Sequence, residues 1–194
     1  MVLKDIQKEI ILEETVYIDE TFISVVNSKI IKEDGKKLRG ISANEIGIAC
    51  GIDDKGNKLI INTNTCKPSF SSTLKAYGEH IKPQSTLIHD GEKSHNILVK
   101  NLELNSKVYK SKNTKKLNDK ENPLNIVNKL HFRIKLFLNH HNGFNRKHLQ
   151  DWLNLFWFID TTPGDKYDKV KAFILLAIKR PNRLKYRDFY SKSS

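Results

Sequence analysis

Residues 16–22 read VYIDETF, and this stretch decides the fold more than any other segment of the chain. Apolar and β-branched residues surround Asp19, which is the pattern of a strand inside a sheet. A carboxylate in such a run is costly to bury without a cation or a hydrogen-bonding partner. Asp19 is therefore predicted to be a metal ligand held rigidly by a strand, the alternative being an ordinary strand-end acid.

A second acid follows a second apolar run. Residues 86–91 read TLIHDG, so Asp90 ends a short strand just before Gly91. Taken alone, this position is equally typical of a turn. Together with Asp19, it predicts two strand-borne carboxylates, the kind of ligand that hard divalent cations prefer.

A strong helix is predicted over residues 124–142, with Asn122 as its cap, Pro123 at its first position and Gly143 as its stop. Its apolar positions repeat at helical spacing and predict one buried face: Ile126, Val127, Leu130, Ile134, Phe137 and Leu138.

The same helix carries three polar residues on a neighbouring face. Asn128, His131 and Lys135 are three and four residues apart, so they lie one above the other. Asn128 is a candidate third ligand, although a helix Asn is usually only solvated and an amide binds magnesium less strongly than a carboxylate does. Lys135 is placed to reach a phosphate, and His131 to orient a metal-bound water or a phosphate, or simply to cover the core.

The order of the predicted elements indicates an α/β fold. Strands are predicted over 16–26, 42–53 and 58–64, then a strand ending at Asp90 and a fifth strand over 107–111, with helices over 69–79, 95–102, 124–142, 146–159 and 170–178. In the second strand, large residues alternate with small ones, so one face allows close packing. Three antiparallel strands followed by strand and helix alternation predict a ribonuclease H-like mixed sheet flanked by helices.

Five stretches together resemble the catalytic domain of bacterial insertion-sequence transposases of the DDE superfamily. They are residues 17–22, 39–53, 87–93, 127–135 and 143–154, and their order and spacing carry the resemblance. The similar branch is ISXO-like, in which Asn replaces the third acid and Lys follows it. The family's amino-terminal zinc-ribbon or helix-turn-helix region, which reads transposon ends, has no legible counterpart in these residues.

The resemblance implies Asp19, Asp90, Asn128 and Lys135 as catalytic residues, with Asp19, Asp90 and Asn128 holding two Mg²⁺ or Mn²⁺ ions. It implies cleavage of transposon ends and strand transfer into target DNA by a homo-oligomer. We expect residues 1–160 to form this retroviral integrase-like catalytic domain and residues 161–194 to form a helical, basic extension. Glu20 and Glu92, beside the two aspartates, are candidates to compensate for the charge that Asn128 lacks.

Composition agrees with a nucleic-acid partner. The formal net charge of the 194 residues is +12, which favours attraction to a polyanion. Candidate DNA contacts are Lys110, Lys112, Lys115, Lys116, His131 and Lys135, with a further basic cluster over 179–187. No apolar run approaches the length needed to cross a bilayer, and a cytoplasmic protein that associates with the nucleoid is expected.

Cysteine and histidine spacing argues against a zinc site. Cys50 and Cys66 are expected to be free thiols, and neither His89 nor His95 has metal-ligand spacing. Two other classes of protein stay open. A ribonuclease H-like nuclease or resolvase would hydrolyse DNA without joining strands, and an inactive, truncated or domesticated transposase would bind DNA without binding two metals.

Overall fold

A computed structural model describes residues 2–24, 45–64, 67–114, 117–141 and 146–179. Five strands form one sheet in the order β3-β2-β1-β4-β5: β1 (Thr15–Ser24), β2 (Glu45–Asp53), β3 (Lys58–Asn62), β4 (Thr86–His89) and β5 (Asn105–Val108). β1, β2 and β3 pair antiparallel, whereas β4 pairs parallel with both β1 and β5. A meander joined to two parallel strands is the ribonuclease H-like arrangement, so the predicted fold class is confirmed.

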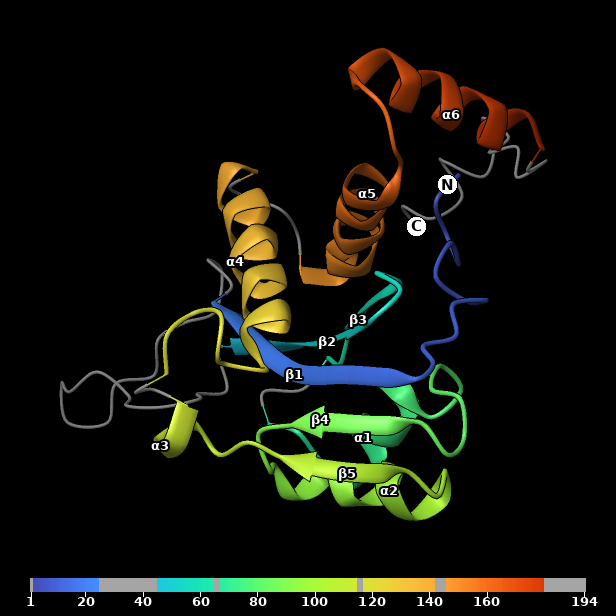
Figure 1. The fold of residues 1–194 in the computed structure, drawn as a ribbon. Helices are drawn as coiled ribbons and strands as arrows, with labels where there is room; N and C mark the ends of the chain where they lie inside the picture. Colours follow the sequence, from blue (N-terminus) through green and yellow to red (C-terminus); the bar gives the residue numbers. More distant parts are fainter. Residues whose placement is uncertain (1, 25–44, 65–66, 115–116, 142–145, 180–194) are drawn as a thin grey trace, which may run out of the picture.

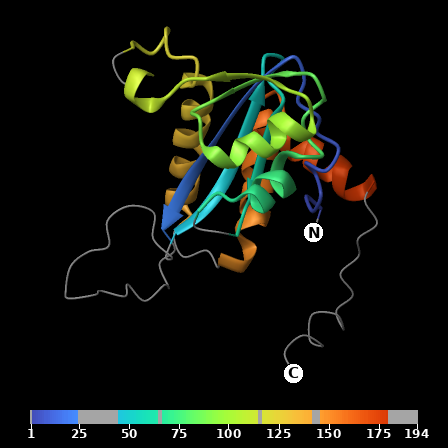
Figure 2. The ribbon, with the colours of Figure 1, turned by 90° about the horizontal axis from the view of Figure 1, so that it is seen from below.

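Helices cover both faces of the sheet (Figure 1). One face carries α1 (Phe70–Tyr77), the short η1 (Lys93–His95) and α2 (Asn96–Asn101), and the other carries α4 (Asn125–His140), η2 (Arg146–His148) and α5 (Leu149–Thr161). Figure 2, seen from below, places α1 and α2 in front of the strands and α4 behind them. α3 (Ser111–Thr114) and α6 (Lys166–Lys179) lie outside these layers.

The sheet separates two hydrophobic clusters, because successive residues of a strand point to opposite faces. The cluster under α4 and α5 takes the large residues of β2, namely Ile46, Ile48, Cys50 and Ile52. The opposite cluster takes Ala49 and the residues that pack around Gly51, where an added Cβ would lie 2.7 Å from Leu12 Cδ1. The prediction of one large and one small face on this strand is therefore confirmed.

Several predicted boundaries are wrong by a few residues. β5 covers Asn105–Val108 and not 107–111, because the chain turns after Tyr109 into the short helix α3. α4 begins at Asn125, since the Asn122 side chain accepts from the Leu124 N–H at 3.0 Å and closes a turn before the helix instead of capping it. The predicted strand ends at 25–26 and 42–44, the stop at Gly143 and Cys66 lie outside the described residues.

α5 is tied to the edge strand β3 and to α4 by polar contacts. The Trp157 indole N–H donates to the Lys58 carbonyl at 2.7 Å. Asp160 forms ion pairs with both Lys58 and Arg133, so one carboxylate joins α5, β3 and α4. These contacts fix α4 over the sheet, where it carries Asn128.

α6 contacts the rest of the described chain mainly through α5. Phe173 meets Phe158 edge-on at 5.9 Å between ring centroids, and Lys169 donates to the Ile159 carbonyl. No α6 residue is buried. The division into 1–160 and 161–194 stays a prediction. None of the helices in the described ranges combines the length and hydropathy that a membrane span requires.

Candidate metal centre

Asp19 and Asp90 lie at matching positions on adjacent parallel strands. The last paired residues of β1 and β4 are Tyr17 and Ile88, and each aspartate comes two residues later. Tyr17 and Ile88 both pack into the cluster under α4, so alternation places Asp19 on that face. Asp90 directly follows the end of β4, and its Oδ1 atom lies 3.8 Å from His95 Nδ1. β1 and β4 are adjacent and parallel, as predicted, and the charge of Asp90 acts on Asp19, which lies in the middle of β1.

The surroundings of Asp19 disfavour the charged form of its carboxyl group and raise its pKa. Burial, the charge of Asp90 and the charge of Glu20 together raise the pKa of Asp19 from 3.8 to about 7. The Glu20 N–H, which donates to Asp19 Oδ1 at 2.9 Å, and the charge of His95 oppose this shift only in part. A divalent cation at this position would neutralise both carboxylates, so the donor set fits a metal.

α4 presents Asn128, His131 and Lys135 along this side of the sheet, because its buried positions face the core and these three flank them. The helix packs on β1 and β2, with its first turns standing over β1 (Figure 1). Asn128 and Lys135 are exposed, whereas His131 is partly buried. Asn128 is therefore solvent-exposed, and its role as the third ligand stays a prediction.

His131 is placed differently from the prediction of a DNA contact. It hydrogen-bonds to the backbone of Asp19, and burial, followed by the charge of Lys135, lowers its pKa to about 4. The imidazole is therefore neutral at physiological pH and adds no charge toward phosphate. Its Nε2 atom is buried and has no hydrogen-bond partner among the described residues.

Glu20 does not face the candidate centre. Alternation places it on the opposite side of the sheet from Asp19, where its side chain is 6% exposed. There it accepts from the Tyr77 hydroxyl and the His95 ring. The expectation that Glu20 compensates for the charge missing at Asn128 is wrong for this reason. Glu92 is exposed and donates its backbone N–H to Asp90 Oδ1 at 2.8 Å, which fixes the turn after β4.

The fold brings together two histidines that the sequence spacing did not connect. One ligand atom each from His89, Asp90 and His95 lies within 4.8 Å of the others, so these residues form a group capable of holding a metal. Between the two rings, the Nδ1 atoms are 3.1 Å apart and form a hydrogen bond. Burial lowers the pKa of His95, but hydrogen bonding to Glu20 and the nearby acids outweigh it, so this pKa is raised. Burial and the charge of His95 lower the pKa of His89 to about 4.

Residue alternation alone contained a signal for this cluster. Glu20 follows Val16 and Ile18 on the apolar face of β1, and a carboxylate on an apolar face requires a partner. The identity of that partner, His95, comes from a different element 75 residues away and could not be inferred.

Two of the four predicted DNA-contact lysines that precede α4 in the sequence are described. Lys110 and Lys112 are exposed, the second within α3, while Lys115 and Lys116 lie outside the described residues. Cys50 is a buried free thiol, as expected, and burial raises its pKa.

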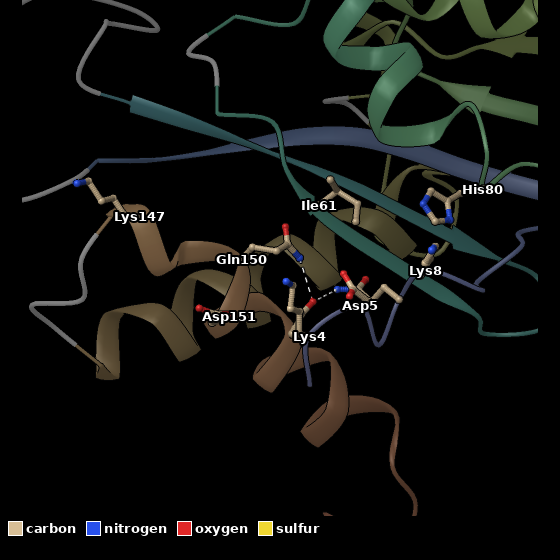
Figure 3. Close-up of a pocket in the computed structure, with 10 residues that line it drawn as sticks. Lys4, Asp5, Lys8, Ile61, His80, Lys147, Gln150 and Asp151 are labelled. Carbon is tan, nitrogen blue, oxygen red and sulfur yellow. Dashed lines mark hydrogen bonds between the residues drawn. The ribbon is translucent and has the colours of Figure 1, made fainter. Parts of the chain in front are cut away.

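A separate pocket of about 400 Å³ lies between the amino-terminal segment, β3 and α5 (Figure 3). Its described lining includes Lys4, Lys8, His80, Lys147 and Gln150, and none of the predicted catalytic residues. At its floor, Gln150 and Gln7 both donate to the Asn154 side chain. These side-chain amides hydrogen-bond to one another and hold the amino-terminal segment against α5. We therefore assign this pocket a structural role and not a catalytic one.

No family model and no curated protein matches the sequence. Solved structures of similar architecture include the HTLV-2 integrase catalytic core domain in complex with magnesium, in a trimeric form. That match has a TM-score of 0.49 and 9% identity, and covers 79% of this chain and 88% of that one. A pre-cleavage Mos1 transpososome and a Mos1 mariner paired-end complex with Mn each give a TM-score of 0.42 at 12% identity, covering 92% of this chain. This chain spans 57% and 56% of those two Mos1 chains.

Proposed function

We propose that this chain is the catalytic domain of a DDE-type DNA transposase of the ISXO-like insertion-sequence branch. The observation that supports this proposal is the pair Asp19 and Asp90, each two residues after the last paired residues of two adjacent parallel strands and close enough for the charge of Asp90 to raise the pKa of Asp19. Its activity is metal-dependent cleavage of transposon ends followed by strand transfer into target DNA. The partner is DNA, and the active assembly is a homo-oligomer.

Asp19, Asp90 and Asn128 would hold two Mg²⁺ or Mn²⁺ ions, which lower the pKa of a bound water or hydroxyl and stabilise charge on the reacting phosphate. The protein's own contribution is positioning. The β1 and β4 strands hold the two carboxylates rigidly, and His131 fixes the backbone of Asp19. Lys135, on the exposed side of α4, binds a phosphate of the DNA strand.

Two chemical steps use this one site. Water first attacks a phosphodiester at the transposon end, so that a new P–O bond forms and the bond to the 3′-oxygen breaks, leaving a 3′-hydroxyl. That hydroxyl then attacks a target phosphodiester and displaces another 3′-oxygen. Because the second step exchanges one phosphodiester for another, it is reversible.

This reversibility gives an assay that does not depend on end recognition. A branched oligonucleotide that mimics the strand-transfer product should be resolved into its two parent strands when Mn²⁺ is added. Hydrolysis at the branch with no rejoined strand would favour a ribonuclease H-like nuclease instead. Absence of both reactions and of Mn²⁺ binding would favour an inactive transposase.

Lys135→Ala is expected to weaken DNA binding without weakening metal binding, because an ammonium on this side of α4 contacts phosphate and not the cation. The slope of log affinity against log salt should become shallower by about 1. Filter binding of duplex DNA over a salt series, beside Mn²⁺ titration, measures both. Lys129→Ala removes an exposed α4 lysine one residue after Asn128 and is the control. If Lys129→Ala changes the slope more than Lys135→Ala does, the phosphate contact belongs to Lys129 and the prediction for Lys135 is wrong.

A further inference from the structure

Behind Asp19, on the face covered by α1 and η1, a chain of polar side chains runs from strand to strand and passes next to Asp90. The Tyr77 hydroxyl lies 3.4 Å from Glu20 Oε1, and both Glu20 oxygens lie 3.1 Å from His95 Nε2. His95 Nδ1 lies 3.1 Å from His89 Nδ1, and His89 Nε2 lies 3.0 Å from Ser106 Oγ. The chain thus links α1, β1, η1, β4 and β5.

The chain is attached to the backbone next to each aspartate. Glu20 directly follows Asp19, and His89 directly precedes Asp90. Consecutive strand residues point to opposite faces, so Glu20 lies behind Asp19. Asp90 follows the end of β4, and its Oδ1 atom lies 3.8 Å from His95 Nδ1, so a link between Glu20 and His89 through His95 holds the backbone at both aspartates. His95, whose side chain is fully buried, hydrogen-bonds to both Glu20 and His89 and so joins the two strands.

The donors and acceptors in this chain match one another. The Gly91 N–H donates to His89 Nδ1 at 3.2 Å, so that nitrogen is an acceptor and the His89 proton is on Nε2, which donates to Ser106. His95 then donates from Nδ1 to His89 and from Nε2 to Glu20. A largely buried hydrogen-bond network of this kind fixes geometry, and loss of one member leaves its partners unsatisfied.

We propose that Glu20, His95 and His89 form a brace that sets the spacing of Asp19 and Asp90 and thereby the affinity of the centre for divalent ions. His95 is a positioning residue in this account, and the inference rests on the metal-binding function proposed above. Residues that orient ligands from behind a metal site typically change affinity by about 10–100-fold when they are replaced.

Two substitutions at one position test the brace. The His95→Gln amide reaches the place of Nε2 and keeps the link to Glu20 while losing His89. The His95→Asn amide reaches the place of Nδ1 and keeps the link to His89 while losing Glu20. Each variant should weaken Mn²⁺ binding by about 10-fold or more, measured by electron paramagnetic resonance of free Mn²⁺. Duplex binding in EDTA should be unchanged. His80→Gln is the control, because that ring also makes one hydrogen bond, 2.8 Å to the Ile10 carbonyl, away from the centre.

A milder substitution keeps the test valid if the buried variants do not fold. Ser106→Ala removes only the acceptor of His89 Nε2 at an exposed position of β5, and its neighbour Asn105→Ala is the matched control. Ser106→Ala should weaken Mn²⁺ binding by about 2–3-fold, and Asn105→Ala should not change it.

The possible outcomes distinguish failure of the brace from failure of the proposed metal-binding function. If wild type binds Mn²⁺ and Asp19→Asn does not, but folded His95 variants bind Mn²⁺ like wild type, the brace is wrong and the metal centre stands. If Mn²⁺ binding by wild type requires His95 but not Asp19, the ion lies on the His89, Asp90 and His95 group, and the brace is overturned. If wild type binds no Mn²⁺, both proposals fall.

Discussion

Asp19→Asn is expected to reduce Mn²⁺-dependent resolution of branched DNA by at least about 10³-fold, because it removes the carboxylate shared by both proposed metal positions. Binding of duplex DNA should stay the same or strengthen slightly, since a negative charge near phosphate is lost. The measurement is single-turnover strand exchange on radiolabelled branched oligonucleotides, with affinity determined separately in EDTA.

Two further variants make this result specific. Asn128→Asp should retain activity far better than Asp19→Asn, because it restores a charged oxygen ligand at the predicted third position. Asp151→Asn removes a partly exposed acid on α5 that pairs with His148, and it should behave like wild type. Equal activity in wild type and Asp19→Asn would rule out the proposed centre.

Asp19→Asn is also expected to stabilise the metal-free protein at pH 8. Because the pKa of Asp19 is raised from 3.8 to about 7, the folded protein binds this proton more tightly than the unfolded chain does. The stability contributed by Asp19 is fully present below pH 4 and is lost as the pH rises through 7. The variant does not titrate there, so from pH 4 to pH 8 its free energy of unfolding should gain about 2–4 kcal/mol over that of wild type.

Urea unfolding in EDTA at both pH values measures this gain, and Asp151→Asn serves as the control for loss of a carboxylate elsewhere. Mn²⁺ at pH 8 should then stabilise wild type and leave Asp19→Asn unchanged, since a ligand stabilises only the state that binds it. A constant difference between variant and wild type across this pH range would contradict the burial of Asp19 beside a second acid.

Local patterns predicted the frame of the centre correctly. The apolar runs around Asp19 and before Asp90 are strands, and the meander that precedes them makes β1 and β4 parallel neighbours. Helical spacing also predicted that Asn128, His131 and Lys135 share one side of α4. These features depend on residues close together in sequence, where the spacing of apolar residues indicates the type of element and its buried face.

Features that depend on long-range contacts could not be predicted. His131 lies on the predicted side of α4, yet its packing on the Asp19 backbone makes it neutral, which its position in the helix does not reveal. Glu20 was expected beside the metal, whereas Tyr77 and His95 hold it on the other face. The resemblance to insertion-sequence transposases predicted Asp19 and Asp90 as metal ligands. It did not predict the hydrogen-bond network of Glu20, His95 and His89.

Anomalous diffraction from a crystal soaked in Mn²⁺ tests the central claim most directly. The account predicts a manganese peak between the carboxylates of Asp19 and Asp90, on the α4 side of the sheet, and its loss in Asp19→Asn crystals soaked in the same way. A peak confined to the rings of His89 and His95, or no peak at Asp19 in crystals that remain ordered, would contradict the account.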